Sequence, residues 1–213
     1  MHFTTVYSCL FDSPSFIPHN HSVVLDELHQ LPENPDSNSL LVLHGGSDIH
    51  PSIYGKLNGY SHVGKVQSYR DVLEQRAIDW AVSHGIPILG ICRGAQLLCA
   101  KAGGTLVQDV TDHHNDHRIY DVRSGASLVT NSCHHQMMVL KDTDHVLVAI
   151  TSPARSKHYL GEYNEKLTIP EEPEVVYFPR LKGLAVQGHP EWMSHNNPFV
   201  KYCLETMNEF FYS

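Results

Sequence analysis

The sequence predicts an α/β domain built around a largely parallel sheet. Short apolar runs alternate with helical patterns along the chain, and buried strands followed by amphipathic helices are typical of parallel sheets. The chain has 213 residues and no Ser/Gly-rich linker or break in composition, which is a length that one core can serve. We therefore expect a single domain over residues 1–213.

The expected elements follow from the apolar patterns and from the turn residues between them. Gly85 ends the first helix and Pro87 allows the next strand to begin. In chain order we expect a strand, a helix, a strand, a helix, three strands and a final helix, at 39–46, 70–85, 86–91, 94–104, 145–150, 174–178, 183–187 and 198–211. The segments 115–123 and 151–173 are too irregular to assign.

Charge and composition exclude several classes of protein. The formal net charge of -8 argues against a nucleic-acid surface, which needs clustered Lys and Arg. No stretch approaches the ~20 apolar residues of a membrane span, and the first residues lack the pattern of a secretory signal. Five cysteines without a C-x-x-C pair argue against a disulfide framework. We expect a cytoplasmic protein with reduced thiols, without membrane or nucleic-acid partners.

A candidate nucleophile lies in the stretch "ILGICRGAQLL" (88–98). A strand runs here into a helix with Cys92 at the turn, which is the pattern of a nucleophile elbow with sulfur in place of oxygen. Gly90 and Gly94 leave room for a sharp, strained turn. The helix N-terminus is expected to lower the thiol pKa from about 8.5. The alternative is a buried structural cysteine.

A candidate base follows the last predicted strand, in "VQGHPEW" (186–192). His189 and Glu191 are two residues apart, so an extended backbone places both side chains on one face. Glu191 can then hold one imidazole nitrogen, and the other can exchange a proton with Cys92. The alternative for an isolated H-P-E is a solvated turn.

Backbone donors are expected after the strand in "LVLHGGSDIHPSIYG" (41–55). Consecutive glycines allow the N–H group of Gly46 to face a ligand. Together with the N–H group of Arg93 it forms a candidate oxyanion hole. The alternative is an ordinary exit from a strand into a turn.

These stretches resemble one family, the class I glutamine amidotransferase-like hydrolases, in the branch of the gamma-glutamyl hydrolases and gamma-glutamyl-gamma-aminobutyrate hydrolase. The matching pieces are "GGSDIHPSIYG", "YRDVLEQRAIDWAVSHGIPILGICRGAQLLCAKAGGTLVQDV", "NSCHHQMMV" and "LAVQGHPEW", in the family's order from about Leu40 to Trp192. The resemblance implies a flavodoxin-like three-layer α/β sandwich with a mostly parallel central sheet. It also implies a triad, an oxyanion hole and a pocket for the glutamyl group, formed respectively by Cys92, His189 and Glu191, by Gly46 and Arg93, and by Gln96, His135 and Gln136.

The sequence departs from the family at two places that shape the pocket beyond the glutamyl group. Only about forty residues precede "LLVLHGG", and the stretch 109–135 is compact. The group that leaves the glutamyl carbonyl is therefore not specified by the resemblance.

Histidines are abundant, and "DHHNDH" (112–117) contains three of them. Metal ligands usually lie on rigid elements, whereas this segment is expected to be a solvated loop, so no metal site is expected. Cys99 is expected in the core, and Cys133 adjoins the expected pocket. Arg70, Asp71 and Glu74 (70–74) are either an exposed helix start or part of the active-site mouth.

The expected activity is hydrolysis of a gamma-glutamyl amide through a thioester on Cys92, with no cofactor. The substrate is a small gamma-glutamyl compound or glutamine. A first alternative is a glutaminase subunit that supplies ammonia to a partner synthase or ligase. A second is a non-catalytic binding module on the same fold, which the presence of Cys92, His189 and Glu191 disfavours.

Overall fold

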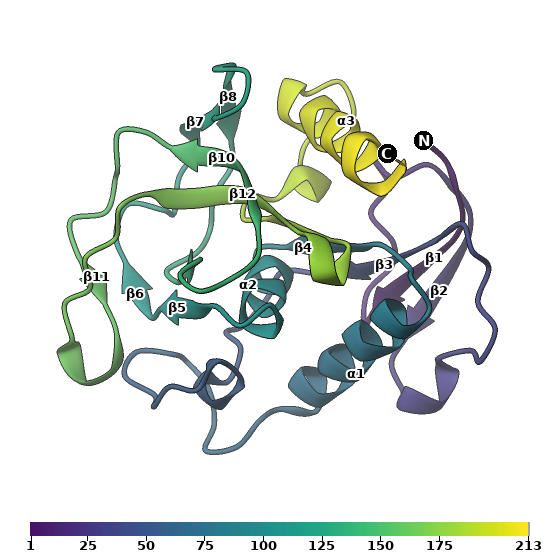
Figure 1. Ribbon diagram of the computed structural model, residues 1–213, viewed down its shortest axis with the longest axis horizontal. Coiled ribbons are helices and arrows are strands. Elements are labelled where there is room, and N and C mark those ends of the chain that lie inside the picture. Colours follow the sequence, from purple (N-terminus) through teal and green to yellow (C-terminus); the bar gives the residue numbers. More distant parts are fainter. Residues whose placement is uncertain (213) are drawn as a thin grey trace.

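A nine-stranded sheet forms the centre of the computed structural model, which describes residues 1–212 (Figure 1). From one edge to the other its strands are β2 (His19–Leu25), β1 (Phe3–Cys9), β3 (Ser39–Leu43), β4 (Ile88–Ile91), β13 (Gly183–Val186), β12 (Glu172–Phe178), β10 (Val146–Thr151), β7 (His117–Asp121) and β8 (Ser127–Thr130). Neighbours are parallel from β2 to β13 and antiparallel from β13 to β8. The sheet therefore has a parallel half and an antiparallel half.

Helices cover both faces of this sheet. One apolar cluster includes residues of α1 (Tyr69–Ser83) and α2 (Arg93–Lys101), and a second includes residues of α3 (Pro198–Tyr212). Figure 1 shows α3 on the opposite side of the sheet from α1 and α2. The predicted three-layer α/β fold is thus confirmed.

Smaller elements complete the chain. Two short antiparallel pairs lie outside the main sheet: β5 (Thr105–Val107) with β9 (Met137–Val139), and β6 (Asp109–Val110) with β11 (Tyr159–Leu160). Single 3₁₀ turns occur at η1 (Leu28–Gln30), η2 (Pro51–Tyr54), η3 (Glu162–Asn164), η4 (Pro179–Leu181) and η5 (Pro190–Trp192). No helix within residues 1–212 has the length and apolar character needed to cross a membrane.

Each of the eight predicted elements is present with ends shifted by a few residues. The first forty residues, for which no element was predicted, contribute β1 and β2, and β1 pairs directly with β3. The unassigned stretch 115–123 contains β7. The carboxyl ends of β3, β4 and β13 are adjacent in the sheet, which is where α/β folds place their ligands.

Candidate active site

Cys92 occupies a strained turn between β4 and α2. Its backbone has φ 50° and ψ -102°, values that residues other than glycine rarely adopt. A Cβ atom on Gly90 would lie 2.5 Å from the carbonyl oxygen of Gly94, and one on Gly94 would collide with the carbonyl oxygen of Leu43. The prediction that a sharp turn here requires both glycines is confirmed.

The thiol of Cys92 differs from the sequence expectation in one respect. Burial raises its pKa to about 12, although the backbone N–H group of Arg93 acts in the opposite direction and Glu191 adds to the rise. The expected lowering of this pKa by the helix N-terminus is therefore wrong, because loss of hydration outweighs the helix end. Cys92 is a neutral thiol at neutral pH, and its proton must be removed before or during attack.

His189 and Glu191 form a hydrogen-bonded pair beside the cysteine. The Nδ1 atom of His189 lies 2.7 Å from Oε1 of Glu191, and the contact is made through the turn η5 rather than through an extended strand. A Cβ atom on Gly45 would lie 2.7 Å from Cε1 of His189 and 3.5 Å from Cβ of Cys92. The imidazole and the cysteine therefore meet against the same glycine, which must lack a side chain.

Two further residues, which the sequence analysis did not identify, hold the imidazole. Asn131 accepts a hydrogen bond from the backbone N–H of His189 and donates one to its carbonyl oxygen, both at 2.8 Å. Trp192 stacks on the imidazole with ring centroids 3.7 Å apart and planes at 1°. Trp192 had a signal in the sequence, since it follows the H-P-E directly, whereas Asn131 had none.

A cavity of about 390 Å³ adjoins this pair. It is lined by Phe11, Asp12, Pro14, Ser15, His44, Gly45, Gly46, His189, Glu191 and Trp192. The stretch 11–15 follows β1, and its place in the cavity wall was not expected. The His189 and Glu191 pair is therefore reached from outside the protein.

The loop that contains Gly46 is fixed by an arginine from α1. Arg70 donates hydrogen bonds from Nη2 to the carbonyl oxygens of His44 and Gly45, at 2.8 and 3.1 Å. Gly46 has φ 143°, and a Cβ atom there would collide with Nη1 of Arg70. The proposed oxyanion donor Gly46 thus lies at the cavity in a conformation that favours glycine.

A buried ion network connects α1 with the residue that follows the nucleophile. Arg93 is 1% exposed and donates from Nη2 to Asp71 at 2.6 Å and from Nη1 to Glu74. Glu74 also accepts from Nε of Arg70 at 2.8 Å. Asp71 and Glu74 are buried, so the alternative of an exposed helix start is wrong for them. The network holds α1, α2 and the 44–46 loop together.

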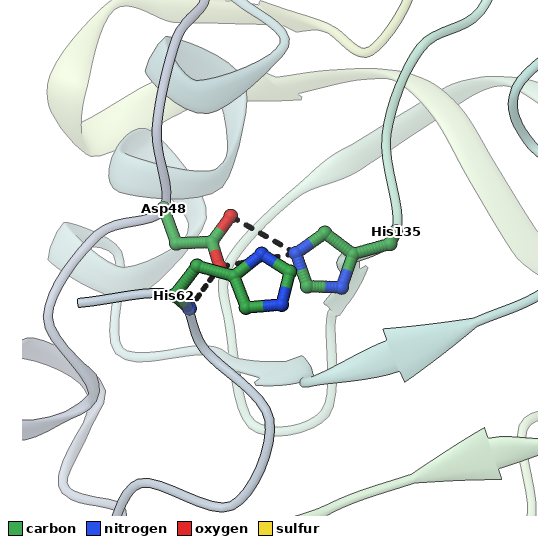
Figure 2. Close-up of side chains that lie close together, drawn as sticks. All are labelled: Asp48, His62 and His135. Carbon is green, nitrogen blue, oxygen red and sulfur yellow. Dashed lines mark hydrogen bonds and ion pairs between the residues drawn. The ribbon is translucent and has the colours of Figure 1, made fainter.

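The predicted pocket residues lie close to one another, and Gln96, His135 and Gln136 are not part of the lining of the cavity beside His189. Gln96 donates from Nε2 to the carbonyl oxygen of Gln136 at 3.0 Å. Nε2 of His135 lies 3.0 Å from Asp48, and its ring stacks on that of His62 with centroids 4.8 Å apart (Figure 2). The charge of Asp48 also raises the pKa of the Cys92 thiol.

The predictions for Cys99 and for the histidine-rich segment 112–117 have different outcomes. Cys99 is fully buried in the core, as expected, and Cys133 is exposed. The segment 112–117 is not a solvated loop throughout, because His113 and His117 are 0% and 3% exposed. Two groups have the geometry to hold a metal ion, one of Asp48, His62 and His135 and one of His113, His117 and Glu174.

Comparison with known proteins identifies the family. Residues 36–157 match the family model Peptidase C26. The glutamine amidotransferase-like protein YvdE of Lactococcus lactis is 32% identical over 78% of this chain and 71% of that protein. A Schizosaccharomyces pombe protein, provisionally named a glutamine amidotransferase, is 40% identical over 39% of this chain but only 32% of its own length. The chain therefore spans about a third of that relative.

The fold is also found among solved structures. The crystal structure of a Thermoplasma acidophilum protein, provisionally described as one of the subunits of GMP synthase, superposes with a TM-score of 0.60. The superposition covers 100% of this chain and 96% of that one at 16% identity, and so it speaks for the fold alone. The family model and the L. lactis relative show that the chain belongs to the peptidase C26 family of glutamine amidotransferase-like proteins.

Proposed function

We propose that this chain is a cysteine-dependent hydrolase that cleaves a gamma-glutamyl amide and releases glutamate and an amine. The observation that carries the proposal is the meeting of Cys92 and His189 against Gly45, with Cys92 on a strained turn. Glu191 holds the second imidazole nitrogen at 2.7 Å. A nucleophile, a base and a residue that orients the base are the parts that acyl transfer through a covalent intermediate requires.

The first half-reaction forms a thioester. His189 takes the proton of the neutral Cys92 thiol as the sulfur attacks the side-chain carbonyl carbon of the substrate. The backbone N–H groups of Gly46 and Arg93 stabilise the oxyanion. Burial favours this concerted transfer, because a free thiolate is disfavoured at a site where the pKa is raised to about 12. The tetrahedral intermediate collapses as His189 returns the proton to the departing amine.

The second half-reaction releases glutamate. His189 removes a proton from water as the water oxygen attacks the thioester carbon, and the same N–H groups hold the second oxyanion. The C–S bond then breaks, and His189 returns the proton to the sulfur of Cys92 as glutamate leaves. Glu191 keeps the Nδ1 proton in place, so that Nε2 remains the basic nitrogen in both halves. No cofactor takes part in this scheme.

Gln96, His135 and Gln136 are proposed to bind the glutamyl head. Gln96 and Gln136 are joined through the carbonyl oxygen of Gln136, and both are buried. His135 and Asp48 place a basic and an acidic group side by side, which complements a substrate head that carries a carboxylate and an ammonium group.

A glutaminase that supplies ammonia to a synthase or ligase as one of its subunits is the second candidate. The names of the relatives favour it, since the L. lactis and S. pombe proteins are named for glutamine amidotransferases and the T. acidophilum protein for a part of a synthase. Both candidates share the thioester chemistry and differ in what leaves the carbonyl carbon.

Glutamate release from free glutamine and from several gamma-glutamyl amines, measured side by side on the isolated chain, separates the two. We expect higher kcat/KM for the substituted amides, because contacts to the amine can stabilise the transition state. Cys92→Ala serves as the blank in every assay. Preference for free glutamine that increases when a synthase or ligase partner is added would replace the hydrolase by the ammonia donor.

A further inference from the structure

A second cluster of titratable side chains lies inside the protein, away from the cavity at His189. It comprises His113, His117, His134, Glu172 and Glu174, and we call it the buried histidine cluster. Their exposed fractions are 0%, 3%, 5%, 0% and 2%. The residues come from the segment before β7, from β7, from the segment before β9 and from β12. The mechanism proposed above uses none of them.

The spacing within this cluster suits a metal ion. Nε2 of His117 lies 2.8 Å from Oε1 of Glu174, and Nδ1 of His113 lies 3.7 Å from the same oxygen. The ligand atoms of these three residues all lie within 4.8 Å of one another. The ring of His134 packs against that of His113 with centroids 4.8 Å apart. Ligand atoms of a tetrahedral zinc ion are about 3.3 Å apart, so His113, His117 and Glu174 need small side-chain shifts, whereas His134, which lies outside that group of three, needs a larger one.

Several polar atoms of the cluster lack a hydrogen-bond partner. Among the described residues, neither ring nitrogen of His113 makes a hydrogen bond, and the same holds for Nε2 of His134 and Oε2 of Glu174. Buried polar atoms are almost always hydrogen-bonded, because leaving them unpaired costs the hydration that burial removed. Four such atoms within one cluster indicate a partner that accepts electron pairs from nitrogen and oxygen.

Each histidine has its second nitrogen near an acceptor, as metal-bound histidines do. Nδ1 of His134 donates to the carbonyl oxygen of Gln136 at 2.8 Å, and Nδ1 of His117 to that of Asn115 at 3.2 Å. Nε2 of His113 faces Glu172 at 3.4 Å. In the described part of the chain, Nε2 of His134 and Nδ1 of His113 are thus left without a partner. Nε2 of His117 bonds Oε1 of Glu174 at 2.8 Å, and an ion bound between these two atoms would replace that hydrogen bond.

The two carboxylates have different surroundings. Glu172 already accepts hydrogen bonds from the N–H groups of Arg155 and Ser156 and from the hydroxyl of Tyr159. Oε1 of Glu174 bonds Oγ1 of Thr151 at 2.7 Å and Nε2 of His117 at 2.8 Å, whereas its Oε2 is unpaired. Glu174 therefore has an oxygen free to bind an ion, whereas Glu172 lies where it can orient His113.

We propose that the buried histidine cluster binds one divalent zinc ion through His113 Nδ1, His117 Nε2, His134 Nε2 and the carboxylate of Glu174. Imidazole nitrogens and carboxylate oxygens are both zinc ligands, and four protein ligands without an open position distinguish a structural site from a catalytic one. The ion joins β7 and β12 to the 131–136 segment. That segment contains Asn131, which holds His189, so the ion braces the active site from a distance.

The group of Asp48, His62 and His135 provides the contrast (Figure 2). His62 is exposed, and the two nitrogens of His135 are matched by Asp48 and Asp109, at 3.0 and 3.4 Å. None of its side-chain atoms is among the unpaired buried atoms of the described residues. No second observation points to an ion there, and this group serves as a control.

The test uses the full chain purified without a polyhistidine tag. Elemental analysis after dialysis is expected to find about one zinc per chain. A strong chelator should lower the melting temperature by more than about 5 °C, and added zinc should restore it, because an ion bound only to the folded state stabilises that state. The Co²⁺-substituted protein should show the visible bands of a tetrahedral site without a thiolate charge-transfer band.

The zinc content of single variants tests which residues bind the ion. His113→Ala and His134→Ala should lose the metal, whereas His114→Ala and His62→Ala should keep it, since His114 and His62 are exposed. The wild-type measurements decide even if the first two variants fail to fold. Wild-type protein that takes up less than about 0.2 zinc per chain, with a melting temperature indifferent to chelator, overturns the proposal. A Co²⁺ spectrum with a thiolate band, or metal lost on His62→Ala, overturns it as well.

Discussion

Two histidine–carboxylate pairs of similar geometry lie at the ends of neighbouring strands, and we propose different roles for them. Nδ1 of His189 is 2.7 Å from Glu191 after β13, and Nε2 of His117 is 2.8 Å from Glu174 on β12. The first pair meets Cys92 at Gly45 and lines a cavity. The second lies beside His113 and His134, which among the described residues have three unpaired nitrogens between them. A histidine–carboxylate pair therefore does not indicate a function by itself, and the residues around the pair determine which role we propose.

Removal of the Cys92 thiol should have the largest effect on activity. Cys92→Ala should abolish turnover, a loss of up to about 10⁶-fold in kcat as for other nucleophiles, while the melting temperature changes little. Cys99→Ala is the matched control and should keep most of the activity, because Cys99 packs in the core. A glutamine-like diazo-ketone should add one mass adduct at Cys92. An adduct on Cys133 or Cys99 contradicts the assignment.

Equivalent substitutions in the two histidine–carboxylate pairs should have different effects, one on the rate and the other on the melting temperature. His189→Ala should cost more rate than Glu191→Gln, for which we expect about 10²–10⁴-fold in kcat, with a melting temperature near that of the wild type. Glu174→Gln should instead lower the melting temperature. Steady-state kinetics and thermal melting measure both. If the losses of His189→Ala and Glu191→Gln multiplied in the double variant, the two residues would act independently and not as a unit.

Glu74 is a buried carboxylate that is paired with two arginines and not with a histidine. Glu74→Gln removes the charge that Arg93 and Arg70 share in the interior, and breaking a buried pair costs about 3–5 kcal/mol. The exposed pair of Asp79 and Lys101 is the control, and Asp79→Asn should cost less than about 1 kcal/mol. Urea unfolding measures both free energies. Equal small losses would mean that the network does not stabilise the fold.

The sequence predicted the parts of the site that local pattern determines. Gly90 and Gly94 are required by the turn at Cys92, and both lie within four residues of one another, so a short motif shows them. The burial of Cys92 depends on the whole fold, and the direction of its pKa was therefore predicted wrongly. The paired strands β1 and β2 were missed for a similar reason, since only pairing with β3 reveals them as part of the sheet.

The buried histidine cluster shows most clearly which features a sequence pattern cannot predict. His113 and His117 are visible in "DHHNDH", but His134 and Glu174 come from segments about twenty and sixty residues further along the chain. Nothing in the segment 112–117 distinguishes the buried His113 from the exposed His114 next to it. The cluster exists only after the antiparallel half of the sheet has formed, and a local pattern cannot report it.

His44 is a buried histidine whose ring bonds a hydroxyl group and not a carboxylate. Nε2 of His44 lies 2.7 Å from the hydroxyl of Ser8. Burial lowers the pKa of His44 to about 4, with Arg70 acting in the same direction and Glu191 and Asp12 against it. His44 is 8% exposed, so the folded protein keeps this ring neutral where the unfolded chain would protonate it.

The pH dependence follows from that difference. Above about pH 6.5 the ring is neutral in both states, and His44 contributes no slope. Between about pH 6.5 and 4 the unfolded state binds the extra proton, so the free energy of unfolding should fall as the pH falls, by up to about 3 kcal/mol. Urea unfolding from pH 7 to 4 measures this loss, and His44→Gln, which keeps a polar partner for Ser8, should flatten it. Identical slopes for the two proteins would show that His44 gains no proton on unfolding, and that burial without a carboxylate does not hold a histidine neutral here.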